Sequence, residues 1–199
     1  MIESKQTETP AGHAMLAGIS GIDASGKGFV TKRIDDELRS KGLRTALIRA
    51  DDWLELPHIR YGKREPGLHF YEHALRLDEM FERLILPLKK DRSVRLSAEL
   101  LTETAEKCHK HTYSFHDIDI ILVEGIFLFK PRYSPSFDLR IWVDCSFETA
   151  MDRAVRRSQE GLDEASTKRA YETIYFPAQL IHLDRDHPVK AADIIINNH

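Results

Sequence analysis

The sequence has very little cysteine and no long run of apolar residues. Cys108 and Cys145 are the two cysteines among 199 residues, and they form no Cys-x-x-Cys pair, so a disulfide framework is excluded. The longest apolar stretch, Ile118 to Phe129, is interrupted by Asp119 and Glu124 and is too short to cross a bilayer. The N-terminal residues do not resemble a secretory signal, so we expect a cytoplasmic location.

A strong excess of one charge is also missing. The net charge is −3, from 29 basic and 32 acidic residues, so no general attraction to nucleic acid or to anionic membranes is expected. The partner that we expect is a small molecule, and a homo-oligomer stays open. With 42% apolar residues, the chain can bury one core. We therefore expect a flexible tail at 1–13 and a single domain at 14–199.

Short apolar runs alternate along the chain with segments of helical periodicity. The runs are Met15 to Ile19, Thr45 to Ile48, Ile120 to Val123, Leu139 to Val143 and Ile194 to Ile196. Several are β-branched and unbroken, as strands buried on both faces are. This alternation predicts an α/β fold in which a parallel β-sheet is flanked by helices.

Four helices are predicted between and after these strands. The first begins at Lys27 and closes at Gly42, and the second spans about Phe70 to Leu86 and is ended or kinked by Pro87. A third begins near Ser146, which is a good N-cap residue. The fourth runs from about Ser166 to Arg185 and contains an internal proline.

A glycine-rich segment lies between the first predicted strand and the first predicted helix. Its residues Gly21 to Lys27, GIDASGK, match the first seven positions of the P-loop, G-x-x-x-x-G-K. Glycines let backbone N–H groups wrap a phosphate, and the Lys27 ammonium reaches the outer phosphates. We therefore predict a fold of the P-loop nucleoside triphosphate hydrolase type that binds ATP. The nucleotide-binding residues expected are Gly21, Ile22, Asp23, Ala24, Ser25, Gly26, Lys27, Gly28 and Phe29.

The residue after the P-loop lysine departs from the usual pattern. A Ser or Thr hydroxyl commonly binds Mg²⁺ there, whereas this chain has Gly28. We expect Mg²⁺ to be held by ATP oxygens, water and carboxylates.

Carboxylates follow the predicted strands, where ligands of parallel sheets gather. Asp51 follows the second strand and Glu124 the third. Phosphoryl transfer needs one carboxylate that accepts the proton of the acceptor hydroxyl and another that holds Mg²⁺. We assign Asp51 to proton acceptance and Glu124 to binding Mg²⁺, with Asp51 as a second expected ligand of the ion. For Asp52 and Asp144, which also end strands, a plain solvated loop is an equal alternative.

Basic residues appear on the third helix and in the loop from residue 57 to 67. Arg153, Arg156 and Arg157 share one helix face and could clamp the phosphates as part of a lid at about 153–168; the alternative is a solvated helix face. Arg60, with Trp53 close by, would suit an anionic or ring-bearing substrate, although a mobile surface loop is an equal interpretation.

Four segments in the same order resemble the uridine kinase family. They are the run from Gly18 to Lys27, the turn Asp51-Asp52-Trp53, the strand end Glu124-Gly125-Ile126, and the tail from Ala192 to Ile196. The resemblance runs from about residue 14 to 198. The family belongs to a wider P-loop group with pantothenate kinase, phosphoribulokinase and nicotinamide riboside kinase.

This resemblance implies roles for particular residues. Asp51 falls at the family's catalytic aspartate, Glu124 at its magnesium-associated glutamate, Glu72 with His73 at a sugar contact, and Arg153 and Arg157 at the start of the lid. It implies ATP as the donor, a ribose 5′-hydroxyl as the typical acceptor, and a substrate-binding insert at about 51–110.

Two departures from the family pattern concern the acceptor. The stretch from Ser97 to Glu106 lacks the Tyr and His of nucleoside-specific members, and Ser158 to Glu164 contains no arginine. The leading hypothesis is a uridine kinase-like enzyme in which Lys27, Asp51, Arg153 and Arg157 are catalytic. One alternative keeps the chemistry but acts on pantothenate, a sugar phosphate or another small alcohol. Another is a nucleotide-binding module without catalysis.

Overall fold

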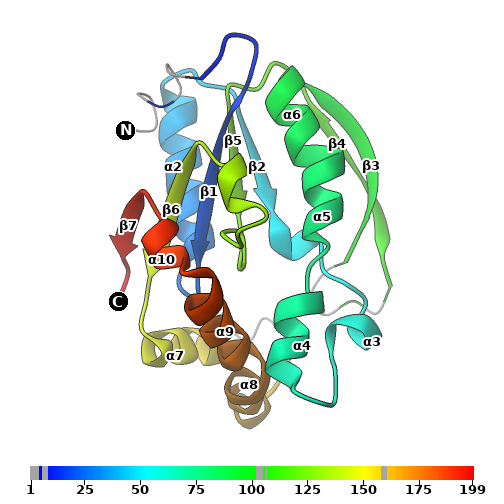
Figure 1. Ribbon diagram of the computed structural model, residues 1–199, viewed down its shortest axis with the longest axis vertical. Helices are drawn as coiled ribbons and strands as arrows, with labels where there is room; N and C mark the ends of the chain where they lie inside the picture. The colour runs from blue at the N-terminus through cyan, green and yellow to red at the C-terminus, as the bar shows by residue number, and fades with distance from the viewer. Residues whose placement is uncertain (1–4, 6–8, 102–104, 106, 158–160) are drawn as a thin grey trace.

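A parallel sheet lies at the centre of the chain. The computed structural model describes residues 5, 9–101, 105, 107–157 and 161–199. The sheet has the order β2-β5-β1-β6-β7, and every neighbouring pair is parallel (Figure 1). Its strands are β1 (Met15–Gly21), β2 (Thr45–Arg49), β5 (Ile120–Glu124), β6 (Leu139–Asp144) and β7 (Ile194–Asn197). All five predicted strands are therefore confirmed, and so is the predicted α/β class.

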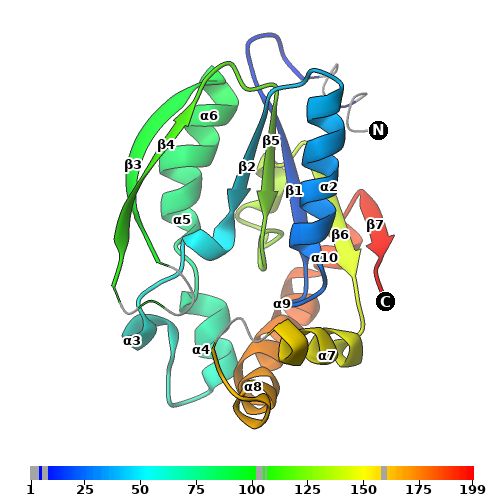
Figure 2. The same cartoon turned by 180° about the vertical axis from the view of Figure 1, so that it is seen from behind.

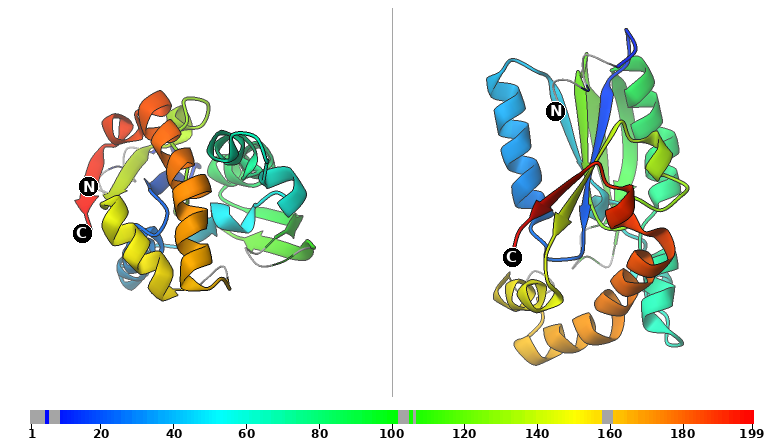
Figure 3. Two further views of the ribbon diagram at one scale, coloured as in Figure 1. Left: turned by 90° about the horizontal axis from the view of Figure 1, so that it is seen from below. Right: turned by 60° about the vertical axis from the view of Figure 1, so that its left-hand side comes forward.

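Helices cover both faces of this sheet, as Figure 3 shows from two further directions. Helix α2 (Lys27–Ser40) buries Leu38, with Val30 and Ile34 partly buried beside it, against one face. The opposite face is covered by α5 (Leu77–Met80), a π-helical turn (Phe81–Ile85), α6 (Leu86–Asp91) and α9 (Phe176–Asp186). Side chains alternate between the two faces along each strand, so the sheet is buried on both sides.

A second sheet was not predicted. Strands β3 (Val94–Leu100) and β4 (His109–Phe115) form an antiparallel pair that lies beside α5 and α6. Ala98, Leu100 and Tyr113 are buried against the main core, while their strand neighbours Ser97, Glu99, Thr112 and Ser114 are exposed. This alternation is the period-two signal of a half-buried strand. Polar residues interrupt each apolar run, so the sequence shows no continuous apolar segment at either strand.

Pro87 and Pro177 lie inside continuous helical segments, because a π-helical turn runs directly into α6 and another runs directly into α9. The predicted helix 70–86 is wrong in its bounds, because α4 (Pro66–His73) stops before α5 begins and α6 continues through Pro87 to Asp91. Proline lacks an N–H and its ring clashes with the carbonyl four residues earlier. A π-helical turn directly precedes the segment with Pro87, and another, Tyr171–Tyr175, precedes Pro177. We attribute the continuation of both helices to this local widening.

The remaining helices gather beyond the carboxyl ends of the strands, at the bottom of Figure 1. They are α3 (Pro57–Arg60), α4, α7 (Phe147–Arg157) and α8 (Glu164–Ala170), while α10 (Pro188–Ala191) leads into β7. Ser146 accepts a hydrogen bond from the Thr149 N–H at 3.1 Å, which confirms the predicted cap of α7. The predicted helix at 166–185 is confirmed as α8, the second π-helical turn and α9, and Asp163 caps it. None of the helices in the described ranges combines the length and apolar character of a membrane span.

Gly18, in the middle of β1, leaves room for aromatic rings. A Cβ atom built on it would lie 2.7 Å from Phe137 Cε1 and 2.9 Å from Phe129 Cε1. We expect Gly18→Ala to lower the free energy of unfolding by about 1–3 kcal/mol through overpacking. Denaturant unfolding measures the loss. Adding Phe137→Leu should recover part of it, and strictly additive effects of the two changes would contradict this explanation.

Candidate functional site

The glycine-rich loop joins the central strand β1 to α2, at the lower end of both in Figure 2. Its backbone is left-handed at Ala24 (φ 55°) and at Gly26 (φ 92°). A Cβ atom on Gly21 would lie 2.5 Å from the Val143 carbonyl oxygen, so only glycine fits there. A loop with these conformations turns tightly, and such loops direct successive N–H groups toward a bound anion.

Lys27 is the first residue of α2 and lies back across the loop. Its side chain is buried, and the ammonium donates a hydrogen bond to the Ile22 carbonyl oxygen at 2.9 Å. Gly26 is the N-cap of α2, and no side chain caps the helix. The first N–H groups of α2 and the Lys27 ammonium therefore lie at the same place, and both favour a negative charge.

Two side chains donate hydrogen bonds to the loop backbone at the Ser25 carbonyl oxygen. Asn198 Nδ2 donates to the Ser25 carbonyl oxygen at 2.7 Å, and Arg153 Nη1 donates to the same oxygen at 3.2 Å. Arg153 Nη1 also donates to the Asn198 carbonyl oxygen at 3.0 Å. Arg153 was predicted as a phosphate clamp, a role that stays a prediction, and here it contacts the loop backbone. Asn198 was not predicted as a site residue.

Arg157 lies beside Asp23 of the loop. Its Nη2 atom is 3.7 Å from Asp23 Oδ1 and donates to the Tyr171 hydroxyl at 3.3 Å. The Tyr171 hydroxyl in turn donates to Asp23 Oδ2 at 2.9 Å, and the tyrosine is fully buried. These contacts connect α7 and the second π-helical turn to the loop. The predicted lid at 153–168 includes residues 158–160, which lie outside the described residues.

Glu124 ends β5 next to the loop. The register of β1 and β5 pairs it with Ile19, two residues before Gly21. Burial raises the pKa of the Glu124 carboxyl, while the charges of Lys27 and Arg49 oppose that rise. A Cβ atom on Gly28 would lie 3.8 Å from Glu124 Oε1, so the carboxylate faces the place where a Ser or Thr would stand in the usual motif. The structure therefore brings Glu124 to the loop, as predicted.

Asp51 lies in a 3-10 turn (Ala50–Asp52) directly after β2. It lines a cavity of about 420 Å³ that also has Asp23 of the loop in its wall. Its neighbour Asp52 instead pairs with Arg49 at 2.7 Å. Asp51 thus belongs to the space beside the loop, whereas Asp52 takes part in a surface ion pair.

Aromatic side chains form much of the remaining wall of this cavity. The rings of Tyr61 and Phe70 have centroids 5.9 Å apart, those of Phe70 and Tyr175 are 5.0 Å apart, and the two tyrosine hydroxyls lie 3.1 Å apart. Arg60 is buried in the same wall, and its guanidinium lies 4.9 Å from the centre of the Tyr61 ring. The lining of the cavity therefore combines aromatic surface, the Arg60 guanidinium and the carboxylates of Asp23 and Asp51.

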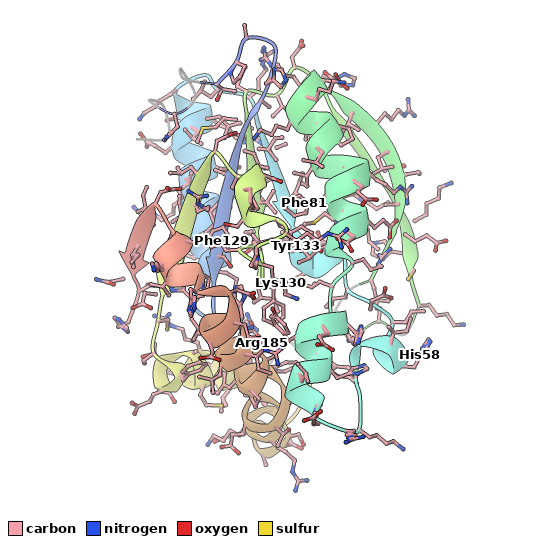
Figure 4. All side chains as sticks on the ribbon, viewed as in Figure 1. His58, Phe81, Phe129, Lys130, Tyr133 and Arg185 are labelled. Carbon is pink, nitrogen blue, oxygen red and sulfur yellow. The ribbon has the colours of Figure 1, made fainter. Side chains whose placement is uncertain are left out.

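Three predicted substrate contacts lie elsewhere. Trp53 is fully buried and stacks on Tyr113 with ring centroids 6.1 Å apart. Glu72 and His73 line a second cavity of about 330 Å³, which includes Lys130 and Tyr133 (Figure 4). Their contact with a sugar stays a prediction. Phe29 is 66% exposed on α2. The stretch from Ser97 to Glu106, which lacks the Tyr and His of nucleoside-specific uridine kinases, is described by the structure only at residues 97–101 and 105.

No cluster of three or more His, Cys, Asp or Glu side chains suited to a metal ion occurs within the described residues. Mg²⁺ is commonly held by one or two carboxylates together with substrate phosphates rather than by a cage of protein ligands. Glu124, buried beside Lys27 and facing Gly28, is the carboxylate best placed for this.

Comparisons with known proteins support the fold. No family model and no curated protein matches the chain. Among solved structures, a possible uridine kinase from Bacillus stearothermophilus is 20% identical with a TM-score of 0.76, and the match covers 98% of each chain. A candidate fructose transport system kinase from Silicibacter sp. TM1040 is 16% identical with a TM-score of 0.69, over 98% of this chain and 96% of the other.

A more distant solved structure is D-glycerate 3-kinase from Cryptococcus neoformans. It is 14% identical with a TM-score of 0.64, over 89% of this chain and 84% of the other. These likenesses confirm a P-loop kinase-like fold and, at the level of the fold, the resemblance to uridine kinases. At such identities they show the fold alone.

Proposed function

We propose that this chain transfers the γ-phosphoryl group of ATP to a hydroxyl group of a small molecule. The observation that carries the proposal is the cavity that Asp51 shares with Asp23 of the glycine-rich loop, residues 21–27, which is called the phosphate loop from here on. A donor phosphate on the loop and an acceptor in the cavity would then meet at these two residues. Positioning of this kind supplies most of the catalysis in phosphoryl transfer.

Each side chain of the site has a distinct task in this proposal. The loop amides and the Lys27 ammonium bind the phosphates, and Lys27 exchanges its bond to the Ile22 carbonyl for a phosphate oxygen. Asp51 accepts the proton of the acceptor hydroxyl. Arg157, already beside Asp23, is close enough to the loop to stabilise charge on the transferred group.

Mg²⁺ would be held by Glu124, with Asp51 as a second carboxylate and the phosphates supplying further oxygens. When bound, the ion neutralises charge on the phosphates. Because Gly28 supplies no hydroxyl, the chain relies on these carboxylates.

The leading acceptor is a nucleoside, as in uridine kinases. The cavity lies within the size range of small-molecule sites, and the rings of Tyr61, Phe70 and Tyr175 offer apolar surface for a base. A second candidate is a small hydroxy acid or sugar phosphate, because buried Arg60 would pair with its anionic group. The structurally similar D-glycerate 3-kinase is named for D-glycerate, which is a small hydroxy acid.

The test is ATP consumption against a panel of acceptors. Uridine, cytidine, D-glycerate, fructose, pantothenate and ribose 5-phosphate would each be supplied with Mg·ATP, and the phosphorylated product would be identified by mass spectrometry. Phosphorylation of a nucleoside supports the leading acceptor, whereas turnover with an anionic acceptor that Arg60→Met abolishes supports the second. ATP binding without turnover across the panel would favour a non-catalytic nucleotide-binding module.

The raised pKa of Glu124 makes a prediction about stability and pH. A carboxyl whose pKa is raised in the folded state stabilises the fold at low pH, and that contribution is lost as the pH rises through the folded-state pKa. Glu124→Gln does not titrate. In metal-free, nucleotide-free buffer, we expect the Tm of this variant relative to the wild type to increase between about pH 4.5 and 8, by a few degrees.

Thermal unfolding across this pH range measures the effect, and exposed Glu148→Gln is the matched control. Mg·ATP should then stabilise the wild type more than Glu124→Gln, because the ion needs the carboxylate. A Tm difference that is constant with pH would contradict the burial argument.

A further inference from the structure

The C-terminal end of the chain contacts the phosphate loop directly. After β7, the Asn198 N–H donates to the Asp144 carbonyl oxygen at 2.9 Å, so the backbone continues the pairing of β6 with β7 by one residue. This bond directs the Asn198 side chain at the loop, where its amide donates to the Ser25 carbonyl oxygen. Residues 173 positions apart in the sequence are joined in this way.

The Ser25 carbonyl belongs to the same peptide unit as the Gly26 N–H. The described backbone contains no cis peptide bond. In a trans peptide the carbonyl and the N–H point in opposite directions. Asn198 and Arg153 both bind the Ser25 carbonyl oxygen, so the Gly26 N–H is directed away from these two side chains.

Close packing supports the same arrangement. A Cβ atom on Gly26 would lie 2.4 Å from Asn198 Nδ2, so the carboxamide rests against the glycine itself. Gly26 also has the left-handed φ of 92°, which a glycine adopts without strain. A residue with high backbone freedom is thereby restrained from outside, by a hydrogen bond and by contact.

We infer that Asn198 is a positioning residue of the phosphate site: it orients the Ser25–Gly26 peptide so that the Gly26 N–H is already aimed at a bound phosphate. Arg153 shares this task, because it donates hydrogen bonds to the carbonyl oxygens of both Ser25 and Asn198. The inference rests on the proposed function, since it concerns how the loop receives a triphosphate. It places the last strand and the residue after it within the nucleotide site.

Asn198 is better suited than Arg153 to a test of this inference. Removing Arg153 would also remove a positive charge near the phosphates, whereas Asn198 is neutral. Asn198→Ala deletes the amide donor, and Asn198→Leu deletes it with little change in side-chain size. The matched control is Asn197→Ala, because Asn197 is the neighbouring residue on β7 and is exposed, whereas the Asn198 amide binds the Ser25 carbonyl oxygen.

The experiment measures the binding of Mg·ATP and of inorganic tripolyphosphate by calorimetry, with the Tm of each variant. We expect both Asn198 variants to bind each ligand about tenfold more weakly, by the same factor for the two, as loss of one ordering hydrogen bond implies. Their Tm values should fall by no more than a few degrees, and the affinity of Asn197→Ala should stay at the wild-type level. Asn198→Ala, which only truncates the side chain, carries the comparison if Asn198→Leu does not fold.

Wild-type affinity in both Asn198 variants would overturn the inference. So would a loss for ATP without a loss for tripolyphosphate, because that pattern would place Asn198 at the base or ribose. If the wild-type chain bound neither ligand, the proposed function itself would fail. If the wild-type chain and the Asn198 variants bound both ligands equally well, only the inference about Asn198 would fail.

Discussion

Replacing Asp51 by asparagine is expected to lower kcat about a thousandfold, whereas the Kd for Mg·ATP should rise by no more than about tenfold, because Glu124 and the phosphates still hold the ion. Asp51 lines the same cavity as Asp23 of the phosphate loop, where the acceptor would be bound. Asparagine has the same shape but cannot accept the acceptor's proton. Steady-state kinetics with the acceptor identified in the panel, and calorimetry with ATP, measure the two quantities.

Asp52→Asn is the matched control for this prediction. Asp52 is the next residue in the same turn, but its carboxylate is paired with Arg49 rather than facing the cavity. A partly exposed ion pair of this kind contributes little, so kcat should change by no more than about threefold. Equal losses of ATP affinity and of turnover in Asp51→Asn would contradict the assignment of Asp51 as the base.

The central sheet could be predicted because its sequence signals are local. Each of the five runs is continuous and flanked by turn residues, and the strand β1 followed by Gly21 to Lys27 places the loop without any tertiary information. Helix α2 ends where Gly42 takes a positive φ of 83°, as the sequence predicted. Local agreement of propensity, pattern and turn chemistry makes such elements predictable.

Features that depend on long-range packing could not be predicted in the same way. The contact of Asn198 with Ser25 exists because β7 joins the sheet beside β6, and nothing near residue 198 in the sequence indicates it. Similarly, Glu72 and His73 follow Phe70 along the chain but line a different cavity, and how α4 packs against its neighbours, which the local sequence does not indicate, decides which residue meets which cavity.

The other large effect is expected at Lys27. Its ammonium is buried at the N-terminus of α2, where water is largely excluded and a charge interacts strongly with a bound phosphate. Lys27→Met keeps an unbranched, apolar side chain in that space but removes the charge. We expect kcat/KM to fall by about a thousandfold, the scale seen when one preorganised stabilising group is removed from an active site.

Both kinetic constants should change in Lys27→Met, because the ammonium contacts the phosphates in the ground state and gains importance as charge moves onto the leaving oxygens. Lys32→Met is the matched control: Lys32 is on the same helix, 62% exposed, and paired with Asp36 four residues on. Such surface pairs are worth about 0.2–0.5 kcal/mol, so that variant should keep nearly full activity. A higher KM for ATP with unchanged kcat in Lys27→Met would restrict the lysine to binding. The transferred phosphoryl group would then have to be stabilised by another cation, for which Arg157, 3.7 Å from Asp23 of the loop, is the candidate.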